Sequence, residues 1–197
     1  GQDIYISFRE DLTDDFGWGP PVKLGPEVNT PGNDHSPAFL QAGGGELYFN
    51  RGPTPLTQIW VVPMSRDGLI LGEARPVSEV NSPTANNGAV TVRRDGRELI
   101  LWSGGAAGER PGTIGLADLF VSTRQSVNHP WSEPVGMGRP VNSEAGDLEA
   151  TLSADGRSVV ISSLRPGRSG RQDLWMSVRS PDGSARVELD AEGCPAP

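Results

Sequence analysis

A seven-residue segment recurs four times along this chain, and no other feature of the sequence constrains the fold as strongly. The copies read DIYISFR, QIWVVPM, DLFVSTR and DLWMSVR, and they begin at Asp3, Gln58, Asp118 and Asp173. Each copy runs from a polar residue through aliphatic and aromatic residues, which is typical of a short β-strand. The copies begin 55, 60 and 55 residues apart, so the chain consists of similar units of about this length.

A second series of residues keeps step with the first. The segments EVNT, EVNS and PVNS contain Asn29, Asn81 and Asn142, and each asparagine is followed five residues later by another polar residue. Each unit then continues with two apolar segments around a glycine turn, as in EATLSADGRSVVIS, which predicts a β-hairpin. The polar residues of this series are Asp34, Asn86 and Asp147.

Units of about 55 residues with about four strands each are typical of β-propeller blades. The sequence therefore predicts an all-β fold of four-stranded antiparallel blades. We expect a half-blade at residues 1–30, blades at 31–82, 83–143 and 144–190, and a tail at 191–197. Closed propellers contain about 4 to 8 blades. About three and a half blades should therefore be part of a larger propeller, or should self-associate through the open face of the ring.

Composition and charge argue against several classes of partner. The formal net charge of −8 disfavours nucleic acid, because phosphate groups require a basic surface. No apolar run approaches the roughly 20 residues that a membrane-spanning helix requires. The single cysteine, Cys194, excludes an internal disulfide and a metal site built from cysteines.

Several segments resemble a known group of propeller repeats. The Asp-x-x-x-Ser/Thr-x-Arg strands, the Ser-x-Asp-Gly turn, and the segments LRPGRSGRQDLW and PWSEPVGMGRPVNS are similar to TolB-type, WD-repeat-like repeats of bacterial envelope and secreted proteins. The resemblance extends from residue 3 to about residue 190. It implies a periplasmic or secreted propeller that serves as a platform for binding or assembly. The second unit departs from the pattern at Gln58 and Pro63, which predicts a looser blade there.

The aspartates that recur in the units are expected to be structural. A position that is filled in nearly every blade favours a role that every blade needs, such as accepting backbone N–H groups of a turn. A ring of carboxylates around a cation is the alternative interpretation. The residues at the start of the recurring strand are Asp3, Asp118 and Asp173, and those of the Asp-Gly hairpin turns are Asp95 and Asp155.

Asp34, Asn86 and Asp147 precede the innermost strands and should lie at the mouth of the central channel, where we would look first for a ligand. Asx turns are the default explanation for them, and a site for a polyol or a hard cation such as Ca²⁺ is the alternative. His35 follows Asp34, but neighbours along a strand point in different directions, which argues against a catalytic triad. The acidic loop at residues 9–19 lacks the spacing of an EF-hand and should be solvated.

The tryptophans repeat with the units, with one exception. Trp60 and Trp175 occupy the aromatic position of the recurring strand, so they should pack between blades. Trp18 and Trp131 each precede the asparagine of their unit by eleven residues, and this repetition favours a structural role for them as well. Trp102 has no aromatic counterpart in the other units. It is therefore a candidate for stacking on a ligand, with ordinary packing as the alternative.

The motifs of two common catalytic designs are absent from the sequence. There is no Gly-x-Ser-x-Gly nucleophile elbow and no Ser-x-Asp-x-Gly-x-x-Trp box of the sialidase type. We therefore assign no catalytic residue, no metal and no cofactor. The chain is expected to be a non-catalytic scaffold that binds a protein or an extracellular carbohydrate. The alternative is a propeller hydrolase or lyase that acts on a carbohydrate at the channel mouth.

Overall fold

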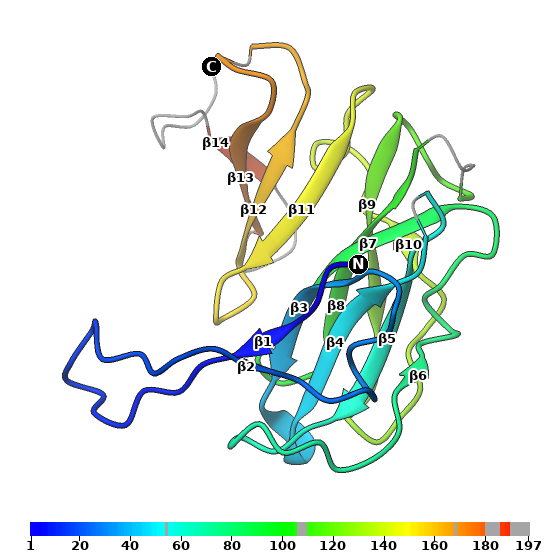
Figure 1. Cartoon of the computed structure of the whole chain (residues 1–197). Coiled ribbons are helices and arrows are strands. Elements are labelled where there is room, and N and C mark those ends of the chain that lie inside the picture. The colour runs from blue at the N-terminus through cyan, green and yellow to red at the C-terminus, as the bar shows by residue number, and fades with distance from the viewer. Residues whose placement is uncertain (54, 106–109, 168, 180–185, 190–197) are drawn as a thin grey trace.

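The computed structural model describes residues 1–53, 55–105, 110–167, 169–179 and 186–189 (Figure 1). Within them the chain forms three four-stranded antiparallel sheets and one two-stranded sheet. In each four-stranded sheet the strands lie side by side in chain order. The prediction of an all-β fold with four-stranded antiparallel blades is confirmed.

The strands follow the repeated units. The half-blade contains β1 (Tyr5–Ile6) and β2 (Val22–Lys23). Blade 1 contains β3 (Asp34–Leu40), β4 (Glu46–Arg51), β5 (Gln58–Pro63) and β6 (Arg75–Pro76), with a short 3₁₀ turn, η1 (Ala42–Gly44), between β3 and β4. Blade 2 contains β7 (Asn86–Val92), β8 (Glu98–Gly104), β9 (Ala117–Thr123) and β10 (Val135–Gly136). Blade 3 contains β11 (Asp147–Leu152), β12 (Ser158–Ser163), β13 (Asp173–Arg179) and β14 (Arg186–Leu189).

These sheets lie within the ranges expected for the half-blade and the three blades, whereas the tail at 191–197 lies outside the described residues. The recurring segment forms the third strand of each blade, namely β5, β9 and β13, and it forms β1 in the half-blade. The second unit is not looser than the others. All six residues of β5, from Gln58 to Pro63, pair with β4, because Pro63 stands at the end of the strand, where a missing N–H costs little.

The inner hairpins of blades 2 and 3 turn at the Asp-Gly pairs. Gly96 and Gly156 have φ angles of 71° and 70°, a left-handed conformation that glycine adopts without steric cost. In each turn the aspartate accepts a hydrogen bond of 3.0 Å from the backbone N–H two residues later. The hydrogen bonds from Arg93 lower the pKa of Asp95, and the hydrogen bond from Ser153 lowers the pKa of Asp155.

Apolar side chains fill the spaces between neighbouring sheets, and each strand contributes to both of its faces. In β9, Phe120 packs against blade 1 whereas its neighbour Leu119 packs against blade 3, because successive side chains of a strand point to opposite faces. The half-blade packs against blade 1 in the same manner, through Ile4 and Phe49. Blades 1 and 2 are therefore each packed against a neighbouring sheet on both faces.

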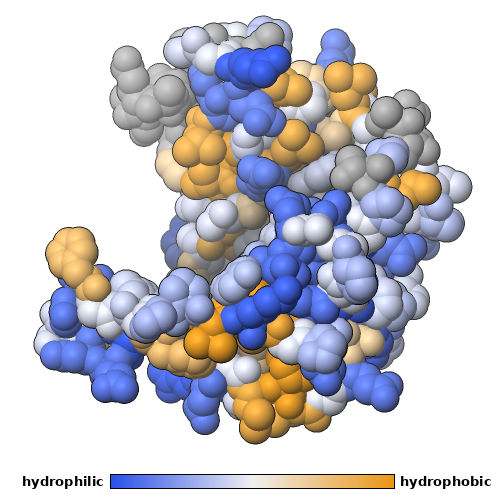
Figure 2. All heavy atoms as spheres, viewed as in Figure 1, coloured by the Kyte–Doolittle hydropathy of each residue, from blue (hydrophilic) through white to orange (hydrophobic). Residues whose placement is uncertain are grey.

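The innermost strands adjoin one another, since β7 contacts both β3 and β11 (Figure 1). The body is curved and hollowed on one side, and an arm formed by the loop between β1 and β2 projects from it (Figure 2). No helix among the described residues has the length and apolar character that crossing a bilayer requires.

Candidate functional site

The polar side chains at the start of the innermost strands are buried and accept hydrogen bonds from arginines. Asp34 at the start of β3 is fully buried, and its carboxylate accepts hydrogen bonds from Arg51 Nε at 2.7 Å and from Thr30 N and Oγ1 at 2.6 and 2.7 Å. Burial is the largest influence on this carboxyl and favours its neutral form, but the bonds from Arg51 and Thr30 together outweigh it and lower the pKa of Asp34. Asp34 is therefore a charged group that already has its partners.

Asp147 occupies the same position in blade 3. It is also fully buried, and it accepts hydrogen bonds from Arg165 Nη2 at 2.9 Å, from Ser163 Oγ at 2.5 Å, and from the N and Oγ of Ser143 at 2.6 and 2.8 Å. An arginine, a hydroxyl side chain and a backbone N–H thus surround the carboxylate in both blades. These contacts belong to the repeat and stabilise the loop that precedes each innermost strand.

In blade 2 this position is taken by Asn87, and the alignment of Asn86 with Asp34 and Asp147 is wrong. Asn87 is fully buried, and its Oδ1 accepts hydrogen bonds from Arg110 Nη2 at 2.8 Å and from Ser82 N at 3.0 Å. Blade 2 has one additional residue in this loop, so the polar side chain follows its asparagine by six residues instead of five. Asn86 instead accepts hydrogen bonds from the N and Oγ1 of Thr57.

Three arginines that the sequence did not reveal complete these contacts. Each donates to the buried polar residue of its blade, which is Asp34, Asn87 or Asp147. Each also donates to the carbonyl of the valine that precedes the repeated asparagine, which is Val28, Val80 or Val141. Each guanidinium also lies over the aromatic ring of the third strand at 4.4 to 5.3 Å, which adds a cation–π contact. The arginines are Arg51, Arg110 and Arg165.

The asparagines of the second series form a further repeated contact. Asn142 Oδ1 accepts the backbone N–H of Leu119 at 3.0 Å, and its Nδ2 donates to the carbonyl of the same residue at 2.9 Å. Asn29 and Asn81 make the same pair of bonds with Ile4 and Ile59. Each side-chain amide therefore makes, with one residue of the third strand, the pair of hydrogen bonds that a residue of a neighbouring strand would make.

The aspartates of the recurring strand differ among the units. Asp118 accepts the backbone N–H groups of Ile114 and Gly115, and Asp173 accepts those of the turn before β13, as expected for a turn cap. Asp3 makes no such contact in the described part of the chain and instead pairs with Lys23 Nζ at 2.8 Å.

His35 lies beside the bulge of β3. Its Nδ1 is 2.9 Å from Ser36 Oγ, and burial lowers the pKa of the imidazole although the nearby Asp34 charge opposes this. Ser36 and Glu149 have φ angles of 51° and 44°, unusual for residues with a side chain. The register shifts in all three innermost strands at this level, so the bulge is a property of the blade and not of one site.

Trp102 lies over the backbone of its strand partner, and its surroundings are those of a packed residue. A Cβ atom added to Gly88 would lie 1.8 Å from the Trp102 ring, and the ring packs against the apolar cluster between blades 2 and 3. Trp131 is buried, with Arg124 over its ring and Tyr48 at its edge. Trp18 is 59% exposed, although it repeats in phase with Trp131, so the two tryptophans do not share the same environment.

The structure brings together no set of metal ligands in the regions that it describes, where no group of three or more His, Cys, Asp and Glu side chains could hold an ion. In the acidic loop at 9–19, the carboxylate of Asp11 accepts hydrogen bonds from the N and Oγ1 of Thr13, and Asp15 pairs with Arg9 at 3.1 Å. Asp34, His35 and Asp147 lie on two strands that are separated by β7, and each carboxylate has its own arginine.

Comparison with known proteins supports the fold. A sialidase of Trypanosoma rangeli, solved with sialic acid, superposes with a TM-score of 0.52 at 12% identity, over 94% of this chain and 33% of the sialidase. A structure from an analysis of two prolyl endopeptidases has a lower TM-score of 0.39 at 15% identity, over 89% of this chain and 28% of that chain. The GH43 BlXynB protein from Bacillus licheniformis has a TM-score of 0.36 at 13% identity, over 86% of this chain and 32% of that chain.

The superposition on the sialidase shows that the chain has the architecture of part of a β-propeller. The chain spans about a third of the length of each of these structures. No protein-family model matches the sequence, and no curated protein matches it. At these identities the similarity shows the fold alone.

Proposed function

We propose that this chain is a non-catalytic β-propeller module that binds a protein partner, of the TolB-like type and with the periplasmic or secreted location that this resemblance implies. One observation carries the proposal. The buried polar residues at the inner strand starts, where a propeller site would lie, are each held by an arginine of their own blade. They are bonded within the repeat and do not converge on a shared ligand.

A carbohydrate-directed hydrolase or lyase is the competing interpretation, and an assay of turnover tests it. We expect the purified chain to hydrolyse neither a fluorogenic sialoside nor a panel of nitrophenyl glycosides above the rate without protein. The variants His35→Ala and Glu149→Gln serve as matched controls, because both residues lie at the bulges of the innermost strands. Turnover that is lost in both variants would overturn the proposal.

A further inference from the structure

Blade 2 has a chemically labile pair of residues near the start of its innermost strand, β7. Asn87 is followed there by Gly88, whereas Asp34 and Asp147 of the other blades are followed by residues with side chains. An asparagine before a glycine is prone to deamidation, because no side chain shields the glycine nitrogen and glycine adopts backbone conformations that are closed to other residues. The chain contains this dipeptide once, at Asn87.

The contacts of blade 2 require both residues of the pair. Asn87 Nδ2 donates to the carbonyls of Ser82 and Ala85, both at 3.0 Å, which a carboxylate oxygen could not do. A Cβ atom at position 88 would lie 1.8 Å from the Trp102 ring, so a glycine is needed beside it. The fold therefore needs an amide followed by a glycine, and this combination is the one most open to deamidation.

The same surroundings keep the pair from reacting. Deamidation requires the backbone nitrogen of Gly88 to reach Cγ of Asn87, so the peptide group between the two residues has to rotate. The carbonyl of this peptide group accepts hydrogen bonds from Asn50 Nδ2 at 2.7 Å and from Thr57 Oγ1 at 2.9 Å. The side chain of Asn87 is fully buried and is held by Arg110 Nη2 at 2.8 Å. These contacts have to open before the nitrogen can reach the amide.

We propose that Asn87 is a deamidation site that the folded blade keeps unreactive and that unfolding of β7 exposes. In the open chain the Gly88 nitrogen bonds to Cγ of Asn87, the Cγ–Nδ2 bond breaks, and the N–H proton leaves with the amide group as ammonia. Water then adds to either carbonyl of the resulting succinimide and opens the ring, which yields aspartate or isoaspartate. Water is the second reactant, and no group is oxidised or reduced. The inference does not depend on the proposed binding function.

Neither product restores the contacts of Asn87. Aspartate has no side-chain N–H for the carbonyls of Ser82 and Ala85. Isoaspartate adds a methylene group to the main chain, which shifts the register of β7 against β8 beyond this point. Deamidation therefore makes part of the damage caused by unfolding irreversible.

Mass spectrometry of the full chain tests the assignment. The chain is incubated at mildly alkaline pH with or without a denaturing concentration of guanidinium chloride, and it is then digested with pepsin at acidic pH, where deamidation is slow. We expect Asn87 to deamidate at least about 100-fold more slowly in the folded protein, because the reaction proceeds from the small fraction of open molecules. In denaturant Asn87 should react before every other asparagine, including its neighbour Asn86.

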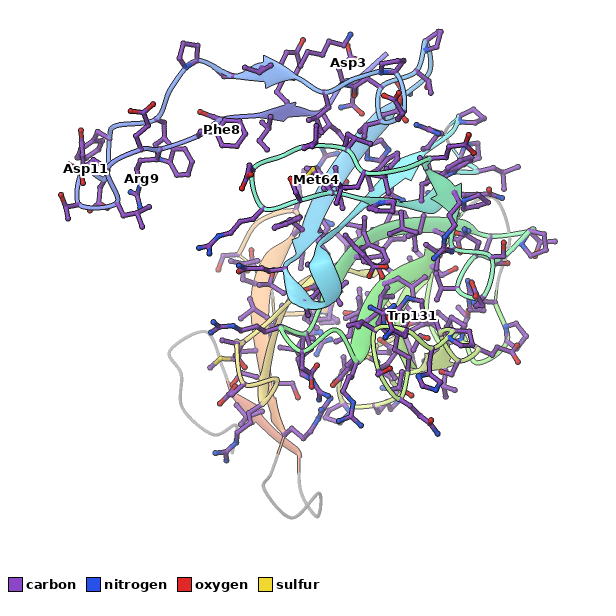
Figure 3. The ribbon with its side chains drawn as sticks, turned by 90° about the horizontal axis from the view of Figure 1, so that it is seen from below. Asp3, Phe8, Arg9, Asp11, Met64 and Trp131 are labelled. Atoms are coloured by element: carbon purple, nitrogen blue, oxygen red, sulfur yellow. The ribbon has the colours of Figure 1, made fainter. Side chains whose placement is uncertain are left out.

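The variant Asp67→Asn provides a matched control. Asp67 is exposed and precedes Gly68 in the turn that follows Met64, so the variant has a second asparagine–glycine pair, outside the core (Figure 3). This pair should react in the folded protein within about tenfold of its rate in denaturant. A rate in the folded protein as low as that of Asn87 would show that the buried contacts are not what protects Asn87.

Variants of the contacts test the role of the held peptide group. Asn50→Ala removes one of the two donors to the carbonyl of Asn87 and should raise the rate in the folded protein several-fold, whereas Asn128→Ala in an exposed loop should leave it unchanged. An unchanged rate in Asn50→Ala would overturn the role of this hydrogen bond. Equal rates at Asn87 with and without denaturant, or an intact Asn87 in denaturant while other asparagines react, would overturn the inference.

Refolding tests the consequence. When partly deamidated chains are returned to native conditions and treated briefly with a protease, the resistant molecules should be depleted of aspartate and isoaspartate at position 87. Equal amounts of these products in the resistant and the degraded molecules would show that the modification does not impair refolding. The turnover assay is independent of all these outcomes and tests the proposed function separately.

Discussion

Replacing Asn87 by aspartate would make blade 2 resemble its neighbours, and we predict that it destabilises the protein. The side-chain amide of Asn87 both accepts and donates buried hydrogen bonds. Its Oδ1 accepts from Arg110 Nη2 at 2.8 Å, as the carboxylates of the other blades do with their arginines. Its Nδ2 donates to the carbonyls of Ser82 and Ala85 at 3.0 Å and of Thr57 at 3.4 Å. The carboxylates at the equivalent positions face N–H and O–H donors instead.

The magnitude follows from these contacts. The Nδ2 group carries two hydrogens, so its two contacts at 3.0 Å count as full hydrogen bonds and the contact at 3.4 Å shares one of these hydrogens. Hydrogen bonds between neutral groups contribute about 1 kcal/mol each, so the loss of the two donated bonds removes about 2 kcal/mol. A charged acceptor strengthens the bond from Arg110 by about 1–2 kcal/mol. The second carboxylate oxygen would also face three carbonyl oxygens in the interior, which adds repulsion. We expect the free energy of unfolding of Asn87→Asp to fall by about 2 kcal/mol at neutral pH, or about 4–8 °C in Tm.

The pH dependence distinguishes this explanation from a general packing defect. The three carbonyls and burial favour the protonated carboxyl, so its pKa in the folded protein should be raised. A raised pKa gives stability that is present below the unfolded-state pKa and is lost as pH rises through the folded-state value. Asp34→Asn is the reciprocal control. Because the pKa of Asp34 is lowered, its stabilisation is present above the unfolded-state pKa and is lost as pH falls through the folded-state value.

Urea denaturation followed by circular dichroism between pH 2.5 and pH 7.5 measures both effects, because the stabilisation by Asp34 is lost only below the usual aspartate pKa. The deficit of Asn87→Asp relative to the wild type should shrink as pH is lowered. The deficit of Asp34→Asn should also shrink, but because the wild type loses the stabilisation by its carboxylate. An Asn87→Asp variant as stable as the wild type at neutral pH would show that the charge pair with Arg110 outweighs the lost amide bonds, and the reasoning would be refuted.

Other contacts of the repeat give further predictions. Asn142→Ala leaves a buried N–H of the third strand without an acceptor and should cost about 2–3 kcal/mol in urea denaturation, whereas the exposed Asn128→Ala should stay within about 0.5 kcal/mol. Gly88→Ala places a Cβ against the Trp102 ring and should lower Tm and shift the tryptophan emission; an unchanged spectrum and Tm would contradict the packing. Asp173→Ala should destabilise by about 1 kcal/mol with or without a chelator. A Tm of the wild type that falls when chelator is added would favour a bound cation instead.

The sequence predicted the architecture well because the repeat reports on geometry. Apolar residues at equal spacing and an Asp-Gly pair in the hairpin specify strand faces and a turn that requires a left-handed glycine, so the order of strands in each blade could be read from one unit and carried to the next. The sequence did not predict the length of the loop that precedes the innermost strand of blade 2. Blade 2 has one extra residue before Asn87, so counting five residues from Asn81, as in the other units, leads to Asn86 instead of Asn87.

The arginines of the inner contacts could not be found by spacing. Arg51 ends β4, Arg165 follows β12 by two residues, and Arg110 comes from the loop after β8. A guanidinium on a long flexible side chain reaches the same carboxylate or amide from several backbone positions, whereas an asparagine that bonds one backbone residue must start from a fixed place. This is why the asparagines kept their phase in the sequence and the arginines did not.

The tryptophans show what periodicity can and cannot establish about a binding surface. Trp18 and Trp131 occupy the same position of the repeat, and an arginine lies over each ring, yet one ring is exposed and the other is buried. Their local structure is shared, so the difference comes from the neighbouring sheet: blade 1 provides Tyr48 against Trp131. The sequence therefore identifies the face that every unit buries against its neighbour, and only the structure shows which unit presents that face to solvent.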